Sequence, residues 1–303
     1  MKKVSVIGAG HVGATTAHLI ALKGLADVVL LDIVEGLPQG KALDMMQARM
    51  VEKFDPTITG TNDYKDTADS DIIVVTAGLA RKPGMTRKDL LEKNSSIISS
   101  VIKEAVKHSP DAIFLIVTNP LDGIVKVARE AGNLPKSRIF GMSGGLDSSR
   151  FRHFIAQELK ASPGEVHGIV IGAHSTPMVP LASRATVGGK PLKELLPREK
   201  ILEIIEKTRH GGAEIVGLLK TGSAFYAPAS AITEIVETIV KDLKRVLPCS
   251  VLLEGEYGAD GIFMCVPACI GANGVEGIVE YELDDWEKEE LKESVDYIRD
   301  LTK

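Results

Sequence analysis

The stretch that decides the fold is "VSVIGAGHVGATTAHLI", Val4 to Ile20. It joins a short apolar run to the pattern Gly8-x-Gly10-x-x-Gly13 and then to a segment typical of an apolar helix. In this pattern the first glycine permits a tight turn, the second lets a pyrophosphate approach the backbone, and the third lets helix and strand pack closely. The amino end of the helix then faces the phosphates with its partial positive charge. The stretch therefore predicts the strand, turn and helix of a dinucleotide-binding domain.

An acid at the end of the next apolar run supports this interpretation. The run closes with "LLDI", which places Asp32 about 20 residues after the last glycine, where an acid binds the ribose hydroxyls. A carboxylate there also repels a 2′-phosphate, so NAD is favoured over NADP. The alternative for the glycines alone is a structural turn in another nucleotide fold, such as a methyltransferase. The residues expected at the cofactor are Gly8, Ala9, Gly10, His11, Val12, Gly13 and Asp32.

Short apolar runs alternate with helical patterns through the first half of the chain. The expected strands are Val4–Gly8, Val28–Asp32, Asp71–Thr76 and Ala112–Val117. Because these runs are continuous rather than alternating, they predict strands buried on both faces, as in a parallel sheet covered by helices. Between them, "SIISSVIKEAVKH" has apolar residues at helical spacing. The fold class predicted is α/β, a doubly wound parallel sheet of the Rossmann type.

The second half has a different, α+β pattern. A Gly188-Gly189 pair in "ATVGGKPL" indicates a hairpin. Two long helices are predicted, Ile201–Lys220 and then Phe225–Leu247, with Pro248 ending the second. The remaining elements predicted are strands near Val251, at Ile262–Val266 and at Gly277–Tyr281, and a charged amphipathic helix at the end. We expect a dinucleotide-binding domain in residues 1–142 and a catalytic, substrate-binding domain in residues 143–303.

Composition excludes several classes of function. The chain has 303 residues, is 44% hydrophobic and carries a net charge of -5 without a basic block, so we expect neither nucleic acid nor membrane as a partner. The cysteines are Cys249, Cys265 and Cys269, an odd number without framework spacing, which fits a reducing compartment. Cys265 and Cys269 could start a metal site, but no histidine lies nearby, so we expect buried side chains and no metal. With no signal-peptide pattern, a cytoplasmic location is expected.

A second glycine-rich segment, "GLPQGKAL", resembles a phosphate-binding P-loop only superficially. The spacing from Gly36 to Gly40 and Lys41 is one residue short, and Ala42 stands where Ser or Thr would hold magnesium. We interpret the segment as a loop that leads into a helix, which weakens the hypothesis of an NTPase.

Four further segments carry residues suited to chemistry on an anionic substrate. Asn119 ends a strand in "IVTNPLD", Asp147 and Arg150 are three apart in "GGLDSSRFRHF", and His174 follows a strand in "GIVIGAHSTPMVP". Each has a structural alternative: a turn before proline, a surface ion pair and a structural histidine. Together they are the parts that hydride transfer on a carboxylate substrate needs. The fourth, "LARKPGMTRKDL", is either a solvated loop or a mobile lid that brings Arg81 and its neighbours onto the substrate.

These motifs resemble those of the lactate/malate dehydrogenase family. The similar segments, in the family's order and over nearly the whole chain, are "GAGHVG", "LLDI", "ARKPGMTR", "TNPLD", "LDSSRFR", "GAHS" and "LLKTGSAFYAP". Within the family, "ARKPGMTRKDL" is similar to the malate-specific enzymes of the lactate-dehydrogenase-like branch. Lactate-specific members usually have Gln where this chain has Arg81. The resemblance implies reversible hydride transfer between (S)-malate and oxaloacetate with NAD/NADH.

The resemblance also implies roles for single residues. His174 would accept and return the proton, and Asp147 would hold its imidazole. Arg150 would bind the C1 carboxylate of the substrate, Arg87 would polarise its carbonyl, and Arg81 would bind its second carboxylate. The remaining contacts implied are Asn94 and Val117 to the cofactor, Asn119 to cofactor and substrate, and Ser223 to the substrate pocket.

Some features differ from the family or stay open. Family members usually have Gly-His-Gly-Asp where this chain has Ala173-His174-Ser175-Thr176, and Gly145 replaces a common Val. The alternatives are therefore a lactate or other 2-hydroxy acid dehydrogenase, or an inactive NAD-binding redox sensor. The family resemblance also suggests a homotetramer or homodimer.

Overall fold

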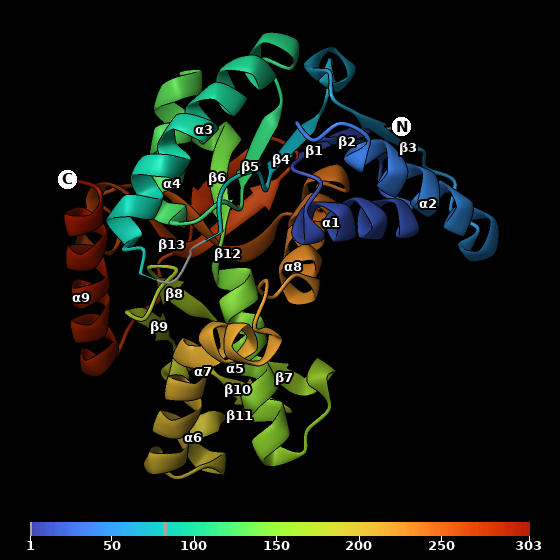
Figure 1. The fold of residues 1–303 in the computed structure, drawn as a ribbon. Helices are drawn as coiled ribbons and strands as arrows, with labels where there is room; N and C mark the ends of the chain where they lie inside the picture. The colour runs from blue at the N-terminus through green and yellow to red at the C-terminus, as the bar shows by residue number, and fades with distance from the viewer. Residues whose placement is uncertain (1, 81–83) are drawn as a thin grey trace.

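The computed structural model describes residues 2–80 and 84–303 (Figure 1). Arg81, which the sequence assigns to the substrate's second carboxylate, lies outside the described residues, as do Lys82 and Pro83.

The amino-terminal half is built on a parallel sheet. Its strands are β1 (Lys3–Ile7), β2 (Asp27–Leu31), β3 (Ile58–Thr61), β4 (Ile72–Val75), β5 (Ile113–Ile116) and β6 (Ile139–Met142). They lie in the order β3-β2-β1-β4-β5-β6, and β1 pairs in parallel with both β2 and β4. The connections therefore diverge after β1, and in such sheets this switch point opens the crevice that binds ligands.

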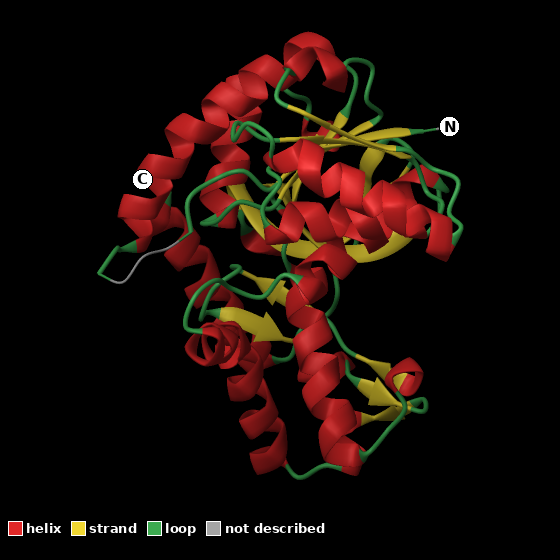
Figure 2. Cartoon of the chain, turned by 45° about the vertical axis from the view of Figure 1, so that its right-hand side comes forward, coloured by secondary structure: helices red, strands yellow, loops and turns green. Residues whose placement is uncertain are grey.

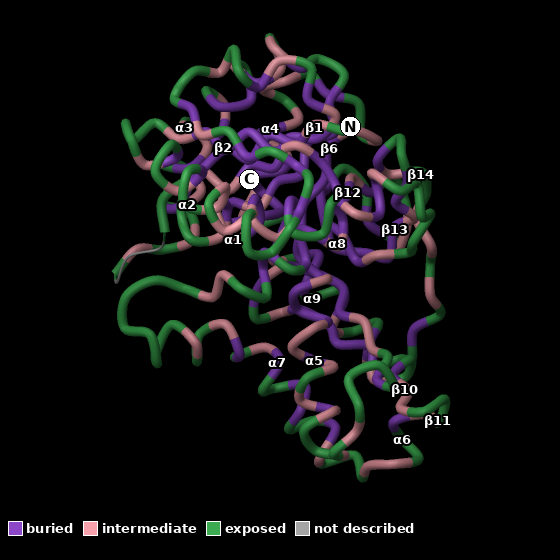
Figure 3. The backbone as a smooth tube through the Cα atoms, turned by 90° about the vertical axis from the view of Figure 1, so that its right-hand side faces the viewer, coloured by how far each residue is buried: buried purple, intermediate pink, exposed green. Residues whose placement is uncertain are grey.

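Helices cover both faces of this sheet, as Figure 2 shows. The helices of this half are α1 (His11–Leu22), α2 (Leu37–Glu52), α3 (Arg87–His108) and α4 (Leu121–Gly132). Val4 and Val6 of β1 share a core with Ile20 of α1, whereas Val75 of β4 shares the opposite core with Ile98 of α3. Residues alternate between the two faces of a strand, so both faces must be apolar, and the buried strands form the centre of Figure 3.

The second half extends the same sheet with five of its described strands, and its other three form a separate three-stranded sheet. Its strands are β7 (Val166–His167), β8 (Val170–Gly172), β9 (Met178–Pro180), β10 (Thr186–Val187), β11 (Lys190–Pro191), β12 (Arg245–Glu254), β13 (Asp260–Gly271) and β14 (Gly274–Ile278). After β6 the order continues β12-β13-β8-β9 with antiparallel pairing, and β14 adds to β13. Its helices are α5 (Gly144–Leu159), α6 (Leu192–Leu195), α7 (Arg198–Leu219), α8 (Tyr226–Val240) and α9 (Asp285–Leu301). The predicted α/β fold with a following α+β part is confirmed.

The prediction of one helix over Phe225–Leu247 is wrong. Helix α8 ends at Val240, and Asp242 and Lys244 take left-handed φ angles of 49° and 53°, which no helix accommodates. The apolar residues that follow belong to β12, in which Pro248 lies opposite Pro267 of β13. Since neither proline has an N–H to donate to the other, the pair is tolerated inside the sheet. The strand predicted at Gly277–Tyr281 is β14, which lies slightly earlier in the chain.

The other predicted elements agree with the structure. The hairpin at Gly188 and Gly189 joins β10 to β11, and both glycines have positive φ. Cys249 and Cys265 are buried free thiols, whereas Cys269, which was also expected to be buried, is a half-buried free thiol near the end of β13. Within the part of the chain that the structure describes, no helix has the length and apolarity needed to cross a membrane.

We expect Gly13→Ala to destabilise the chain. A Cβ at this position would lie 1.8 Å from the carbonyl oxygen of Gly8, so helix α1 would have to move away from the turn. Overpacking of this kind lowers the free energy of unfolding by about 1–3 kcal/mol or more. Urea unfolding measures the change, and Gly10→Ala is the matched control, because a Cβ there meets nothing within 4 Å. Equal stability of both variants would contradict the expectation.

Candidate active site

The turn between β1 and α1 has the geometry expected for a dinucleotide phosphate site. Gly8 has a φ of 109°, and a Cβ there would lie 2.7 Å from Oγ1 of Thr76. Gly10 is the residue that precedes α1; it has no side chain to cap the helix, and its surroundings are open. The first N–H groups of α1 are thus free of a capping side chain, which leaves them available to an anion. These residues fit the pyrophosphate of NAD.

Asp32 is held at the end of β2 by two backbone amides. Ala9 donates its N–H to Oδ2 at 2.6 Å, and Val34 donates to Oδ1 at 3.0 Å. The carboxylate is therefore fixed beside the glycine turn, where it fits a ribose. Lys41, which sequence analysis left without a function, reaches from α2 to the carbonyl oxygen of Ala9 at 2.6 Å. The sequence contains little indication of this contact, because Lys41 is a single basic residue in the second turn of the helix.

The turn after β5 brings Asn119 to the same edge of the sheet. Its side chain is exposed, and its backbone oxygen accepts a 2.7 Å hydrogen bond from the amide of Asn94. Asn94 is fully buried and also bonds to both backbone groups of Leu79, at 2.8 and 3.2 Å. Asn94 thus supports the turn and the start of the "LARKPGMTRKDL" segment, and its predicted contact with the cofactor stays a prediction. Val117 is half-buried just before this turn.

A histidine, an aspartate and an arginine form one hydrogen-bonded group. Nδ1 of His174 lies 2.7 Å from Oδ2 of Asp147, and Nη1 of Arg150 donates to Oδ1 of the same carboxylate at 3.0 Å. Asp147 is 2% exposed, whereas the side chains of His174 and Arg150 are each 15% exposed. Helix α5 begins at Gly144, so Asp147 and Arg150 share a face of its first turns, as predicted. The structural alternatives of a surface pair and an isolated histidine do not describe this group.

The group lies close to the turn after β5. The N–H of His174 donates to Oδ2 of Asp122 at 3.2 Å. Asp122 lies in the first turn of α4, three residues after Asn119. Two glycines of α7 make room on the other side: Cβ atoms at Gly211 and Gly212 would lie 3.4 Å from the side chain of Arg150. Residues distant in the sequence thus converge on one place, with the carboxylate of Asp147 at its centre.

The turn after His174 does not need the glycine that the family usually has there. Ser175 is buried and has no positive φ; its N–H bonds to the oxygen of Ala173 at 2.7 Å, and its own oxygen accepts from Met178 at 2.9 Å. The positive φ in this region, 86°, is at Gly172. A serine at position 175 is therefore unstrained.

The environment of His174 favours its protonated form. Burial disfavours the imidazolium, but the charge and hydrogen bond of Asp147 outweigh burial, so the pKa of His174 lies above its ordinary value. Arg150 opposes this increase in pKa, and Asp122 adds to it. A histidine with this partner can accept a proton and hold it near neutral pH.

Two other predicted residues lie on separate elements. Arg87 is the first residue of α3, behind a capping box made by Thr86 and Asp89, and its guanidinium lies 5.9 Å from the ring centre of Tyr297 on α9. Ser223 is exposed in the connection between α7 and α8. Among the described residues, neither forms a hydrogen bond with the His174 group, so their roles stay predictions.

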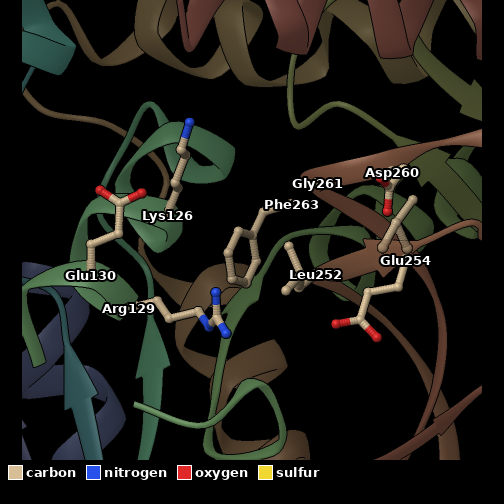
Figure 4. A pocket seen from close by; sticks show the side chains of 9 residues that line it. Lys126, Arg129, Glu130, Leu252, Glu254, Asp260, Gly261 and Phe263 are labelled. Carbon is tan, nitrogen blue, oxygen red and sulfur yellow. The ribbon is translucent and has the colours of Figure 1, made fainter. Parts of the chain in front are cut away.

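A cavity of about 260 Å³ lies elsewhere, between α4 and the hairpin of β12 and β13 (Figure 4). Lys126 and Arg129 line it together with Glu254 and Asp260, so its charges are mixed. Nε of Arg129 is buried and has no hydrogen-bond partner among the described residues. The residues of the His174 group do not line this cavity, so it is separate from the candidate active site.

We expect Asp147→Asn to lower the pKa of His174. Asn keeps the shape of the side chain but removes the negative charge that outweighs burial, so the neutral imidazole should persist to lower pH. NMR titration of the histidine ring protons measures this pKa without substrate, and His174→Asn identifies the signal. Glu158, an exposed acid near the other end of α5, gives the control through Glu158→Gln. An unchanged pKa in Asp147→Asn would contradict the electrostatic account.

Comparison with known proteins agrees with this geometry. Residues 2–141 match the NAD-binding domain of lactate/malate dehydrogenase, and residues 145–303 match the α/β C-terminal domain of the same family. A malate dehydrogenase of Heliobacterium modesticaldum is 53% identical over 300 residues, which are 99% of this chain and 97% of the relative.

Solved structures of both specificities are similar to the chain. The malate dehydrogenase of Cryptosporidium parvum has a TM-score of 0.97 and 44% identity, covering 99% of this chain and 98% of that one. A lactate dehydrogenase of the same organism, complexed with lactic acid and NAD, has a TM-score of 0.96 and 41% identity, covering 99% and 96%. The chain belongs to the lactate/malate dehydrogenase family.

Proposed function

We propose that the chain is an NAD-dependent malate dehydrogenase that interconverts (S)-malate and oxaloacetate. The observation that carries the proposal is the hydrogen-bonded group of His174, Asp147 and Arg150, held next to the turn that carries Asn119. Relatives named malate dehydrogenase at about 53% identity over the whole chain support the substrate. When bound, NAD supplies the hydride chemistry at C2 of the substrate, and the chain's side chains handle the proton and the charges.

His174 is the proposed acid and base. In malate oxidation its neutral imidazole takes the hydroxyl proton on Nε2, because Nδ1 is committed to Asp147 at 2.7 Å. Asp147 fixes the tautomer and stabilises the imidazolium that forms. In the reverse direction the protonated His174 donates to the carbonyl oxygen of oxaloacetate. The raised pKa of His174 keeps the donor form present at a higher pH than for an ordinary histidine.

The arginines are proposed to bind and polarise the substrate. Nη1 of Arg150 donates a hydrogen bond to Asp147, and the other N–H groups of its planar guanidinium are left for the C1 carboxylate of the substrate. Arg87 stabilises the charge that develops on the carbonyl oxygen. Ser223 and Asn119 complete the substrate pocket, while Asn94 and Val117 act at the cofactor together with the glycine turn. These roles rest on the resemblance of the sequence to the family.

Arg81 is proposed to select the substrate. A guanidinium that closes over the site needs the second carboxylate of malate or oxaloacetate, and a methyl group in its place leaves the charge without a partner. Such a loss costs on the order of 2–5 kcal/mol in a site without water. Selection against lactate thus comes from a penalty as well as from attraction. A lactate or other 2-hydroxy acid dehydrogenase is the alternative, and an inactive redox sensor is the alternative of another class.

Domain division, assembly and location complete the proposal. We infer that residues 1–142 bind the cofactor and residues 143–303 supply the acid–base group. A homodimer or homotetramer and a cytoplasmic location are inferred from the family resemblance and the composition.

We expect His174→Asn to retain NADH binding and to lose most turnover. Acid–base catalysis by a positioned side chain contributes about 10²–10⁴-fold, so kcat with oxaloacetate should fall by that order. NADH oxidation followed by absorbance measures kcat, and the fluorescence of bound NADH measures the cofactor's Kd. Near-normal turnover would mean that another group transfers the proton.

We expect Arg81→Gln to shift the ratio of kcat/KM from oxaloacetate toward pyruvate. The substitution removes the charge that pyruvate cannot satisfy, so the ratio should change by about 30-fold or more, which is the penalty given above converted at about 1.4 kcal/mol per factor of ten. Steady-state assays with both substrates measure it. Lys82→Gln, which removes the same charge one residue away, is the control and should leave the ratio unchanged. A ratio that is unchanged in Arg81→Gln, or shifted equally in both variants, would exclude a specific role for Arg81.

A further inference from the structure

Asp122 is a buried carboxylate that the proposed mechanism does not use. It lies in the first turn of α4 and is 4% exposed. Its Oδ1 accepts a 2.7 Å hydrogen bond from the hydroxyl of Ser250 on β12, and its Oδ2 accepts from the N–H of His174 at 3.2 Å. One side chain therefore joins α4, β12 and the residue proposed to transfer the proton.

The backbone that carries His174 depends on side chains for its hydrogen bonds. Strand β8 has only three residues, and its pairing with β13 is at Gly172. Beyond that residue the N–H of Ala173 donates to Oγ of Ser294 on α9 at 2.6 Å. The next N–H, that of His174, donates to Asp122. Because His174 lies past the end of the strand, the contact with Asp122 replaces a ladder hydrogen bond at the point where the position of the imidazole is set.

The contact ties His174 to the turn that carries Asn119. Asp122 lies in the first turn of α4 and Asn119 lies two residues before this helix, where its backbone oxygen is held by Asn94. A shift of the His174 backbone would therefore break the hydrogen bond to Asp122, unless α4 and the Asn119 turn moved with it. Proton transfer needs donor and acceptor within hydrogen-bond reach, so this link bears directly on catalysis.

The contact does not depend on the charge of Asp122. Burial raises the pKa of Asp122, while the hydrogen bonds from Ser250 and His174 lower it. A backbone N–H can only donate, so Oδ2 must accept in either protonation state. In the protonated state the second oxygen can donate to Ser250, whose hydroxyl rotates to accept. The groups that face His174 are Asp147, Arg150 and Asp122, and of these only Asp122 holds its backbone.

We propose that Asp122 is a positioning residue, which fixes the backbone of His174 so that the imidazole stays on Asp147 and faces the substrate carbonyl. This inference rests on the proposed function, because its effect is measured on oxaloacetate reduction. Asp122 touches neither substrate nor cofactor in this account and acts only through His174.

The test compares Asp122→Ala with Asp122→Asn. Ala removes the acceptor, and a displacement of about 1 Å at a reacting group costs up to about 100-fold, so kcat should fall toward that value. KM for oxaloacetate should change little, because Arg150 still binds the carboxylate. Asn should restore most of kcat, since its oxygen can accept from His174 while its NH₂ group donates to Ser250. The Kd of NADH, measured by fluorescence, should be the same in all variants.

Glu287 offers a matched control. It is a fully buried carboxylate that accepts from the backbone N–H and the hydroxyl of Ser183, at 3.0 and 2.8 Å, and in addition from the backbone N–H of Asp284 at 3.1 Å. Glu287→Ala should lower the Tm as much as Asp122→Ala but leave kcat per NADH-binding site intact. Wild-type kcat in Asp122→Ala overturns the inference. So does a loss in Asp122→Asn that equals the loss in Asp122→Ala, because then shape and acceptor do not matter.

Two further measurements keep the test decisive. If Asp122→Ala does not fold, Asp122→Leu combined with Ser250→Ala takes its place, because it removes the acceptor of His174 together with the hydroxyl that would otherwise be left unpaired. A kcat well below that of Ser250→Ala alone, with unchanged NADH binding, supports the inference, whereas a kcat equal to that of Ser250→Ala overturns it. The wild-type chain is assayed first. An inactive wild type refutes the proposed function, whereas an active wild type with an unaffected Asp122→Ala refutes only the role of Asp122.

Discussion

The carboxylate of Asp147 is the constraint on which the rest of the site depends. It is 2% exposed and receives hydrogen bonds from two groups that carry or can carry positive charge, His174 and Arg150. A buried charge is tolerated only when it is paired and hydrogen-bonded, and removing one partner of such a pair costs about 3–5 kcal/mol. The buried carboxylate of Asp147 therefore explains both the fixed orientation of the His174 imidazole, through its hydrogen bond, and the raised pKa of that imidazole, through its negative charge.

The topology of the sheet explains why this anion lies where it does. Strand β6 ends the parallel series and pairs with β12, at Gly141 and Ser250, so the two halves share one sheet instead of meeting through a flexible linker. Helix α5 begins directly after β6, which puts Asp147 at the carboxyl edge of the strands. Asn119 reaches that edge after β5, and Asp32 reaches it after β2. The crevice of the doubly wound sheet thus lies beside the group of His174, Asp147 and Arg150.

Sequence reasoning predicted the parts of the site whose signals are local. Asp147 and Arg150 share a helix face because of their spacing, and the glycine turn follows from backbone geometry. Residues that act through tertiary contacts gave no such signal. Asp122 is one acid at the start of an apolar helix, and Lys41 belongs to a segment that fails as a P-loop, so neither spacing indicates a partner. Pro248 suggested the end of a helix, because proline cannot continue one. Its place inside β12 could not be predicted, since its partner Pro267 is 19 residues away in the chain and only the sheet brings the two together.

The altered residues after His174 do not indicate a loss of function. The serine at position 175 would matter if the backbone needed a positive φ there, but Ser175 has no positive φ in this structure. The missing aspartate of the family pattern would matter if it were needed to charge the imidazole, but Asp147 supplies the larger part of the field that raises the pKa of His174, and Asp122 adds to it. In this chain, neither a positive φ at position 175 nor an acid at position 176 is needed for the geometry and the raised pKa of His174 described above. The one feature of the sequence that favoured an inactive sensor is therefore compatible with a working proton donor.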